Sequence, residues 1–172
     1  MEDLLGITTI FLVSIITWIV AKRSPGIFNI LIGALIIRIF ILLIGHYITP
    51  LPDSTSDAVG FEIKAWKLAQ EGFFNLPSQF EFSNFVFFSW LNAIPYSLFG
   101  RSILMAQSIS LFFGMGTIFF GWKLANIVWD NHIANKVGWT MALFPSLILY
   151  SVLFMREIYI CFFLVLALYG IV

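Results

Sequence analysis

The sequence predicts an all-α fold: a polytopic bundle of transmembrane helices with an interfacial amphipathic helix in its first long outer loop. Of the 172 residues, 60% are hydrophobic and 10% are charged, and the mean hydropathy is +0.99. Soluble domains are usually about 45–50% apolar and about 25% charged, so this chain needs the bilayer as its solvent. The polar residues are also concentrated, because residues 50–81 carry five of the nine acidic side chains: Asp53, Asp57, Glu62, Glu71 and Glu81.

Five apolar segments are predicted to be spans of a single transmembrane domain: residues 4–21, 27–47, 102–125, 137–155 and 158–172. Residues 48–100 form the outer loop with its interfacial helices. Within that loop, residues 85–99 are apolar and aromatic, but they are shorter than the about 20 residues that a crossing needs, and they contain Pro95. We therefore expect a re-entrant or interfacial element there, with a full crossing as the alternative.

The last apolar segment runs to Val172 without a flanking polar residue or an aromatic and basic anchor. This pattern predicts the N-terminal part of a longer protein, truncated at the C-terminus. The alternative is a short last helix that ends near the interface.

Basic residues near the span ends predict the orientation. Lys22 and Arg23 mark the first turn as cytoplasmic, and Lys123 and Lys136 flank a second turn that is expected on the same side. The acidic loop then faces outward, provided that residues 85–99 do not cross the membrane.

Asp57 opens an amphipathic helical pattern that should lie in the plane of the interface. Apolar residues recur at helical spacing and form one stripe: Phe61, Ala65, Leu68 and Ala69. Glu62 is expected to stay in water, and Gly72 ends the pattern. Asp57 has a structural interpretation here, as position N3 of a capping box whose N-cap is Ser54.

Net charge, cysteine content and the charged residue within a span limit the functions that the sequence can have. The net charge is zero, which gives no sign of a nucleic-acid partner. Cys161 is the single cysteine, and the sequence holds no Cys/His cluster, Gly-rich phosphate loop or Ser-His-Asp set. Arg38 lies inside a span, where a charge is expensive, so we expect a buried partner or a contact with a lipid phosphate.

The order of several motifs resembles the N-terminal part of polytopic glycosyltransferases of the GT-C fold, which use polyprenyl-phosphate sugars as donors. They include the protein mannosyltransferases and the lipopolysaccharide sugar transferases. The resemblance covers residue 27 onward and rests on four features: the spacing Asp57, Phe61, Ala65, Leu68, Gly72; the run Leu98-Phe99-Gly100-Arg101; a span that leads into a short inner turn; and Ala142-Leu143-Phe144-Pro145-Ser146 followed by Arg156-Glu157.

The resemblance implies a polyprenyl-phosphate-linked sugar as donor and a multi-pass protein of the bacterial inner membrane, in contact with membrane lipids. It assigns Asp57 as the catalytic base or acceptor-orienting residue, and it places Glu157 where a second carboxylate binds a divalent cation, Mg²⁺ or Mn²⁺, or the acceptor. Asp57 and Glu157 are therefore the candidate metal ligands. Some family members have a second acidic residue directly after the aspartate, whereas this chain has Ala58. The fragment alone is expected to be inactive.

Glycosyl transfer from a lipid phosphate needs a base at the acceptor hydroxyl and positive charge at the leaving phosphate. Arg101 and Arg156 are the candidates for that charge, together with Arg38. We also expect Asp57 and Glu157 to converge, with a cation or an arginine between them. Two other functions stay open: a transporter or flippase-like carrier of a lipid-linked sugar, with Arg38 lining its path, and an inactive truncated membrane protein.

Overall fold

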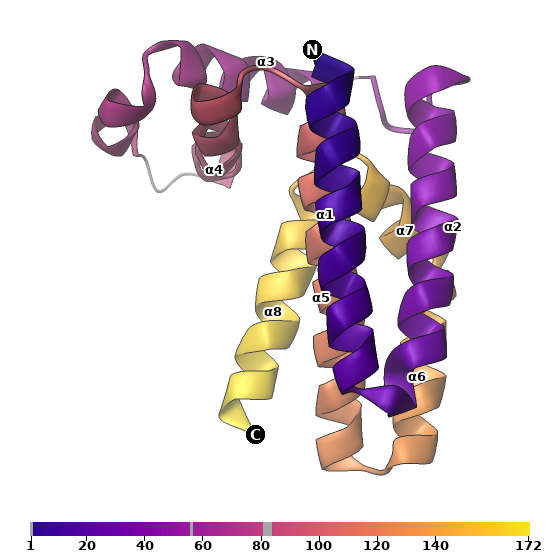
Figure 1. Cartoon of the computed structure of the whole chain (residues 1–172). Helices are drawn as coiled ribbons and strands as arrows, with labels where there is room; N and C mark the ends of the chain where they lie inside the picture. Colours follow the sequence, from indigo (N-terminus) through magenta and orange to yellow (C-terminus); the bar gives the residue numbers. More distant parts are fainter. Residues whose placement is uncertain (1, 56, 81–83) are drawn as a thin grey trace.

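The protein is an all-α bundle with a lateral lobe at one end, as the sequence predicts (Figure 1). The structure, a computed structural model, describes residues 2–55, 57–80 and 84–172, and Glu81 of the acidic loop lies outside them. The described residues contain no strand. In chain order the helices are α1 (Glu2–Arg23), η1 (Pro25–Ile27), α2 (Phe28–Tyr47), α3 (Asp57–Gln70), η2 (Phe73–Gln79), α4 (Asn84–Phe99), α5 (Ile103–Val128), α6 (Asn131–Leu143), α7 (Pro145–Val152) and α8 (Glu157–Ile171).

Among the described residues, three helical stretches are long and apolar enough to cross a membrane: Glu2–Arg23, Pro25–Tyr47 and Ile103–Val128. They correspond to the first three predicted spans. The pair α7 and α8 would make a fourth if it formed one broken span, and its two helices are bent by 113° at the break between them. The 16-residue α4 is a shorter apolar helix, in line with the expectation for residues 85–99.

Local signals in the sequence explain the turns of the bundle. Ser102 begins α5 by accepting a hydrogen bond from the backbone N–H of Met105, and Asp130 begins α6 by accepting one from Ile133. The turn at residue 24 and the turn at Asp130 lie at the same end of the bundle, opposite the acidic loop (Figure 1). This grouping agrees with the basic residues, while the side of the membrane stays a prediction.

The predicted span over residues 137–155 is not one continuous helix. Helix α6 ends at Leu143 and α7 begins at Pro145, with Phe144 in an extended conformation between them. The proline ring restricts the preceding residue to extended geometry, and proline has no N–H to continue the ladder. The segment is apolar throughout, so hydropathy alone does not reveal the break.

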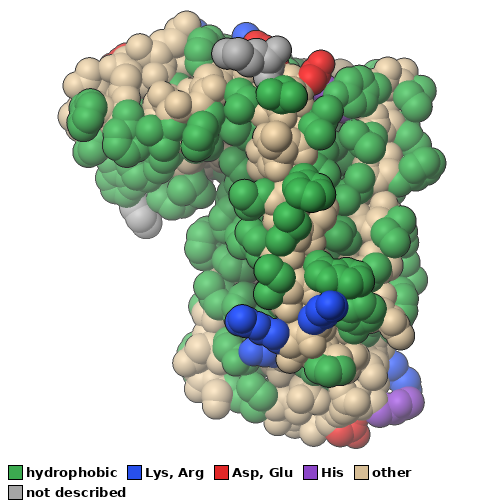
Figure 2. All heavy atoms as spheres, in the orientation of Figure 1, with side chains coloured by type: hydrophobic (Ala, Val, Ile, Leu, Met, Phe, Trp, Pro, Cys, Tyr) green, Lys and Arg blue, Asp and Glu red, His purple; other side chains and the backbone are tan. Residues whose placement is uncertain are grey.

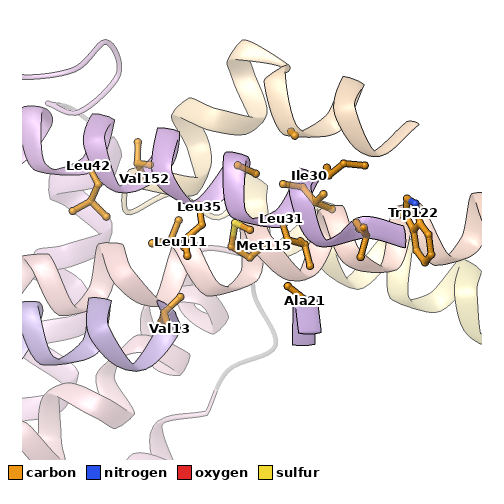
Figure 3. Close-up of a cluster of buried hydrophobic side chains, with 14 of the residues drawn as sticks. Val13, Ala21, Ile30, Leu31, Leu35, Leu42, Leu111, Met115, Trp122 and Val152 are labelled. Atoms are coloured by element: carbon orange, nitrogen blue, oxygen red, sulfur yellow. The ribbon is translucent and has the colours of Figure 1, made fainter. Parts of the chain in front are cut away.

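A cluster of buried apolar side chains holds the bundle together (Figure 3). Leu31 and Leu35 of α2 face Leu111 and Met115 of α5 within this cluster. Glycine allows the closest approach of α1 and α5, because a Cβ at Gly6 would lie 2.4 Å from the Cβ of Leu104.

The lateral lobe consists of α3, η2 and α4, and a second apolar cluster joins it to the start of α5, the joint after α7 and the start of α8. The α3 stripe is buried as expected at Phe61, Ala65 and Ala69, but it packs on α4 inside the protein, in the cluster that also contains Leu153 and Phe154. Phe61 and Phe88 meet edge to face with ring centroids 5.2 Å apart. Gly72 ends α3 with a positive φ of 93°, as the sequence predicts.

Candidate functional site

A pocket opens where the start of α3, the start of α5 and the joint between α7 and α8 meet. It contains about 510 Å³ of empty space, part of it open to the outside. Its apolar wall includes Ile103, Leu153 and Phe154, and its polar wall includes Glu62 and Arg101. The pocket therefore combines apolar surface with charge at the bundle end that carries the acidic loop.

The charged wall is an ion pair between α3 and the connection that precedes α5. Arg101 donates from Nε and Nη2 to the two carboxylate oxygens of Glu62, at 2.9 and 2.8 Å. Glu62 is 3% exposed, whereas the Arg101 side chain is 38% exposed. The bidentate geometry is the strongest form of this pair, and it joins α3 of the lobe to the start of α5.

Arg101 is positioned by the short connection between α4 and α5. Gly100 adopts a φ of 96°, which favours glycine, and Ser102 begins α5 directly afterwards. The Glu62 carboxylate raises the pKa of Arg101, so the guanidinium stays charged at all physiological pH values. Burial, and then the negative charge of Glu62, also raise the pKa of Tyr96 well above its usual range.

The expectation that Glu62 stays in water is wrong. The buried face of α3 comprises Ala58, Phe61, Glu62, Ala65 and Ala69. Ala58, Glu62, Ala65 and Ala69 follow the i, i+4, i+7, i+11 spacing of one helical face. That spacing of small residues around a carboxylate is the sequence signal that could have identified Glu62 as buried and paired.

Asp57 is the first residue of α3 and is exposed. Ser54 and Ala58, on either side of it in the chain, both line the pocket. The predicted capping box is wrong, because a helix that begins at Asp57 leaves Ser54 too far upstream to be its N-cap. Asp57 lies in the first turn, where the helix dipole favours a negative charge.

The joint before α8 brings a second arginine to the lobe. Arg156 lies over the ring of Phe61, 5.7 Å from its centroid, and its Nε is 3.4 Å from Oε1 of Glu157. In the part of the chain that the structure describes, no hydrogen bond or ion pair joins Asp57 to Glu157. The joint does approach α3, where Arg156 contacts the expected Glu157, whereas Arg101 pairs with Glu62.

The described residues do not form a cluster of side chains that is ready to bind a cation. Among the described residues, no group of three or more His, Cys, Asp and Glu side chains is arranged to hold a metal ion. Oε2 of Glu157 is buried without a hydrogen-bond partner, so this carboxylate has unused acceptor capacity. A divalent cation at Asp57 or Glu157 stays a prediction.

Arg38 is remote from the pocket and has the buried partner that was expected. Its side chain is 1% exposed, and Nη1 donates to the carbonyl of Ala142 at 2.8 Å while Nη2 donates to that of Met141 at 3.3 Å. Nε donates to Oγ of Ser151 at 3.0 Å. Arg38 thus binds the carbonyls that α6 leaves open where it ends before Pro145. This buried position of Arg38 supports neither a contact with a lipid phosphate nor a role in lining a transport path.

In comparisons with known proteins, the chain matches no family model, no curated protein and no solved structure.

Proposed function

We propose that this chain belongs to a membrane glycosyltransferase that takes a sugar from a polyprenyl-phosphate donor at the bundle end that carries the acidic loop. The observation that carries the proposal is the pocket, whose lining combines a buried carboxylate, paired with a partly exposed arginine, and apolar side chains. A polyprenyl-phosphate sugar likewise combines apolar and polar parts, since it has an apolar chain, an anionic phosphate and a polar sugar.

Arg101 can contact the phosphate while it remains paired. Guanidinium has five N–H donors, and only Nε and Nη2 donate to Glu62. The partly exposed side chain leaves its other donors for a phosphate oxygen at the pocket mouth. Glu62 would then orient the guanidinium, because the bidentate pair fixes its plane.

Asp57 is the proposed base. It is an exposed carboxylate that lies in the chain between Ser54 and Ala58, which line the pocket, and the family resemblance implies this role for it. A base positioned at an acceptor hydroxyl accelerates transfer by about 10²–10⁴-fold.

The test is transfer of sugar from a polyprenyl-phosphate donor by membranes that contain the protein in the longest form its gene encodes. Asp57→Asn should lower turnover by about 10²-fold or more, because the amide keeps the shape but does not accept a proton. Asp53→Asn is the matched control, since Asp53 is exposed in the same loop at φ 63°, a conformation that asparagine adopts readily. Normal turnover of Asp57→Asn would leave Asp57 as a helix-terminal charge only.

A measurement of donor binding distinguishes the proposed role of Asp57 as the base from that of Arg101 as the phosphate contact. Native mass spectrometry should detect polyprenyl phosphate on the wild type and on Asp57→Asn, and should lose it on Arg101→Gln. Equal binding by Arg101→Gln would remove the phosphate contact from the proposal.

A further inference from the structure

The lateral lobe has a polar side and an apolar side, and they belong to different helices. Helix α3 carries Asp57, Glu62, Lys64 and Lys67, with Glu71 directly after it. Neither η2 nor α4 contains a charged residue. Across residues 73–99 the sequence has a single charged side chain, Glu81.

The apolar surface of the lobe faces along the bundle. Figure 2 shows hydrophobic side chains over the underside of the lobe, continuous with those on the flank of the bundle, and fewer of them on its upper surface. The end of η2 and the start of α4 form the lowest part of the lobe in Figure 1, whereas the end of α4 lies at the top. The uncharged helices therefore reach toward the level of the membrane-spanning segments.

Aromatic rings are concentrated at this lower part. Phe80, which follows η2, lies 5.0 Å from Trp90 and 6.2 Å from Phe87 between ring centroids, and it remains 46% exposed. Phe74 of η2 is 94% exposed. Aromatic side chains are typical of the boundary between lipid and water, and exposed apolar patches mark interaction sites, membranes among them.

Helix α3 cannot make the lipid contact that its sequence predicts, because its stripe is already buried against α4. We infer that η2 and the first turns of α4 insert into the interfacial layer of the bilayer beside the bundle, with α3 above them in water. Interfacial elements of this kind bury their apolar face about 5–10 Å below the headgroups. The inference does not depend on the proposed glycosyl transfer.

Continuity with the bundle identifies lipid as the partner. The exposed faces of α1 and α8 are apolar over most of their length, with Phe11, Ile15 and Leu164 among the exposed side chains. A bilayer that covers these faces also reaches the underside of the lobe, since the two surfaces adjoin (Figure 2).

The experiment places a bimane label at single cysteines in a Cys161→Ser background, in lipid nanodiscs. Phe80→Cys probes the end of η2, and Phe99→Cys probes the upper end of α4, where the side chain is 60% exposed. Lys67→Cys on α3 is the water reference. One set of nanodiscs contains a lipid with a nitroxide near the top of its acyl chain, and iodide serves as the aqueous quencher.

The label at Phe80 should lose most of its fluorescence to the nitroxide lipid and little to iodide. The labels at Lys67 and Phe99 should show the reverse preference. If the Phe80 variant fails to fold, Phe74→Cys decides, because that ring is almost fully exposed and its loss removes few contacts. Iodide quenching equal to that of Lys67 would overturn the inference. Shielding from both quenchers would overturn it as well, since a protein surface would then cover this side.

Discussion

Arg38→Met should destabilise the folded bundle by about 2–5 kcal/mol. The change keeps an unbranched stem but removes the donors to Ala142, Met141 and Ser151, which join α2 to α6 and α7. Hydrogen bonds between membrane helices contribute about 0.6 kcal/mol on average and about 1.7 at most, so three of them give this range. Removing the charge of Arg38 does not offset the loss of these hydrogen bonds. The cost of holding that charge in the bilayer is present both when α2 is packed in the bundle and when it is not, so it does not change the free energy of unfolding.

The measurement is the free energy of unfolding by steric trapping in bicelles. Arg23→Met is the control, since Arg23 is exposed at the end of α1 and its loss should change stability by less than about 0.5 kcal/mol. A loss below about 1 kcal/mol for Arg38→Met would refute the idea that this arginine secures the end of α6. The same result would show that the open carbonyls find other donors.

Two further changes test contacts by the same unfolding assay. Gly114→Ala should lower the free energy of unfolding by about 1–3 kcal/mol, because the new Cβ would lie 2.4 Å from the Cβ of Ser151. Its control is Gly60→Ala, whose Cβ meets no atom within 4 Å, so that this change should raise the free energy of unfolding by up to about 1 kcal/mol. Equal effects of the two changes would contradict the close approach of α5 and α7. A double-mutant cycle of Glu62→Gln and Arg101→Gln should give a coupling of about 1–2 kcal/mol, above the surface range because Glu62 is buried, and a coupling near zero would mean that the pair does not hold the lobe.

Hydropathy was sufficient to predict the first three spans, because a helix that faces lipid must be long and apolar throughout. It was insufficient at Pro145, where a helix ends without any change in hydropathy. The backbone constraint of proline was visible in the sequence, but the partner that makes the break tolerable, Arg38, lies more than 100 residues earlier.

The candidate site was predicted in part. Arg101 was singled out and lies in the wall of the pocket, whereas Asp57 was singled out and is exposed at the start of α3. The catalytic and binding roles assigned to them stay predictions. Glu62 was misassigned, because the pattern of apolar residues was taken as the whole buried face of α3. A carboxylate on that face is stable only with a partner from another element, and no periodicity within one helix specifies the partner.

The contact between Arg38 and α6 also has a consequence for biosynthesis. The carbonyls that receive its guanidinium belong to residues 103 and 104 positions later in the chain. At about 5–20 residues per second, the ribosome needs about 5–20 s to deliver them. During that interval α2 must be held in the membrane with an unpaired charge, which costs about 2.5–3.5 kcal/mol at a helix centre. Assembly of this bundle therefore includes a period in which water, headgroups or the insertion machinery substitute for α6.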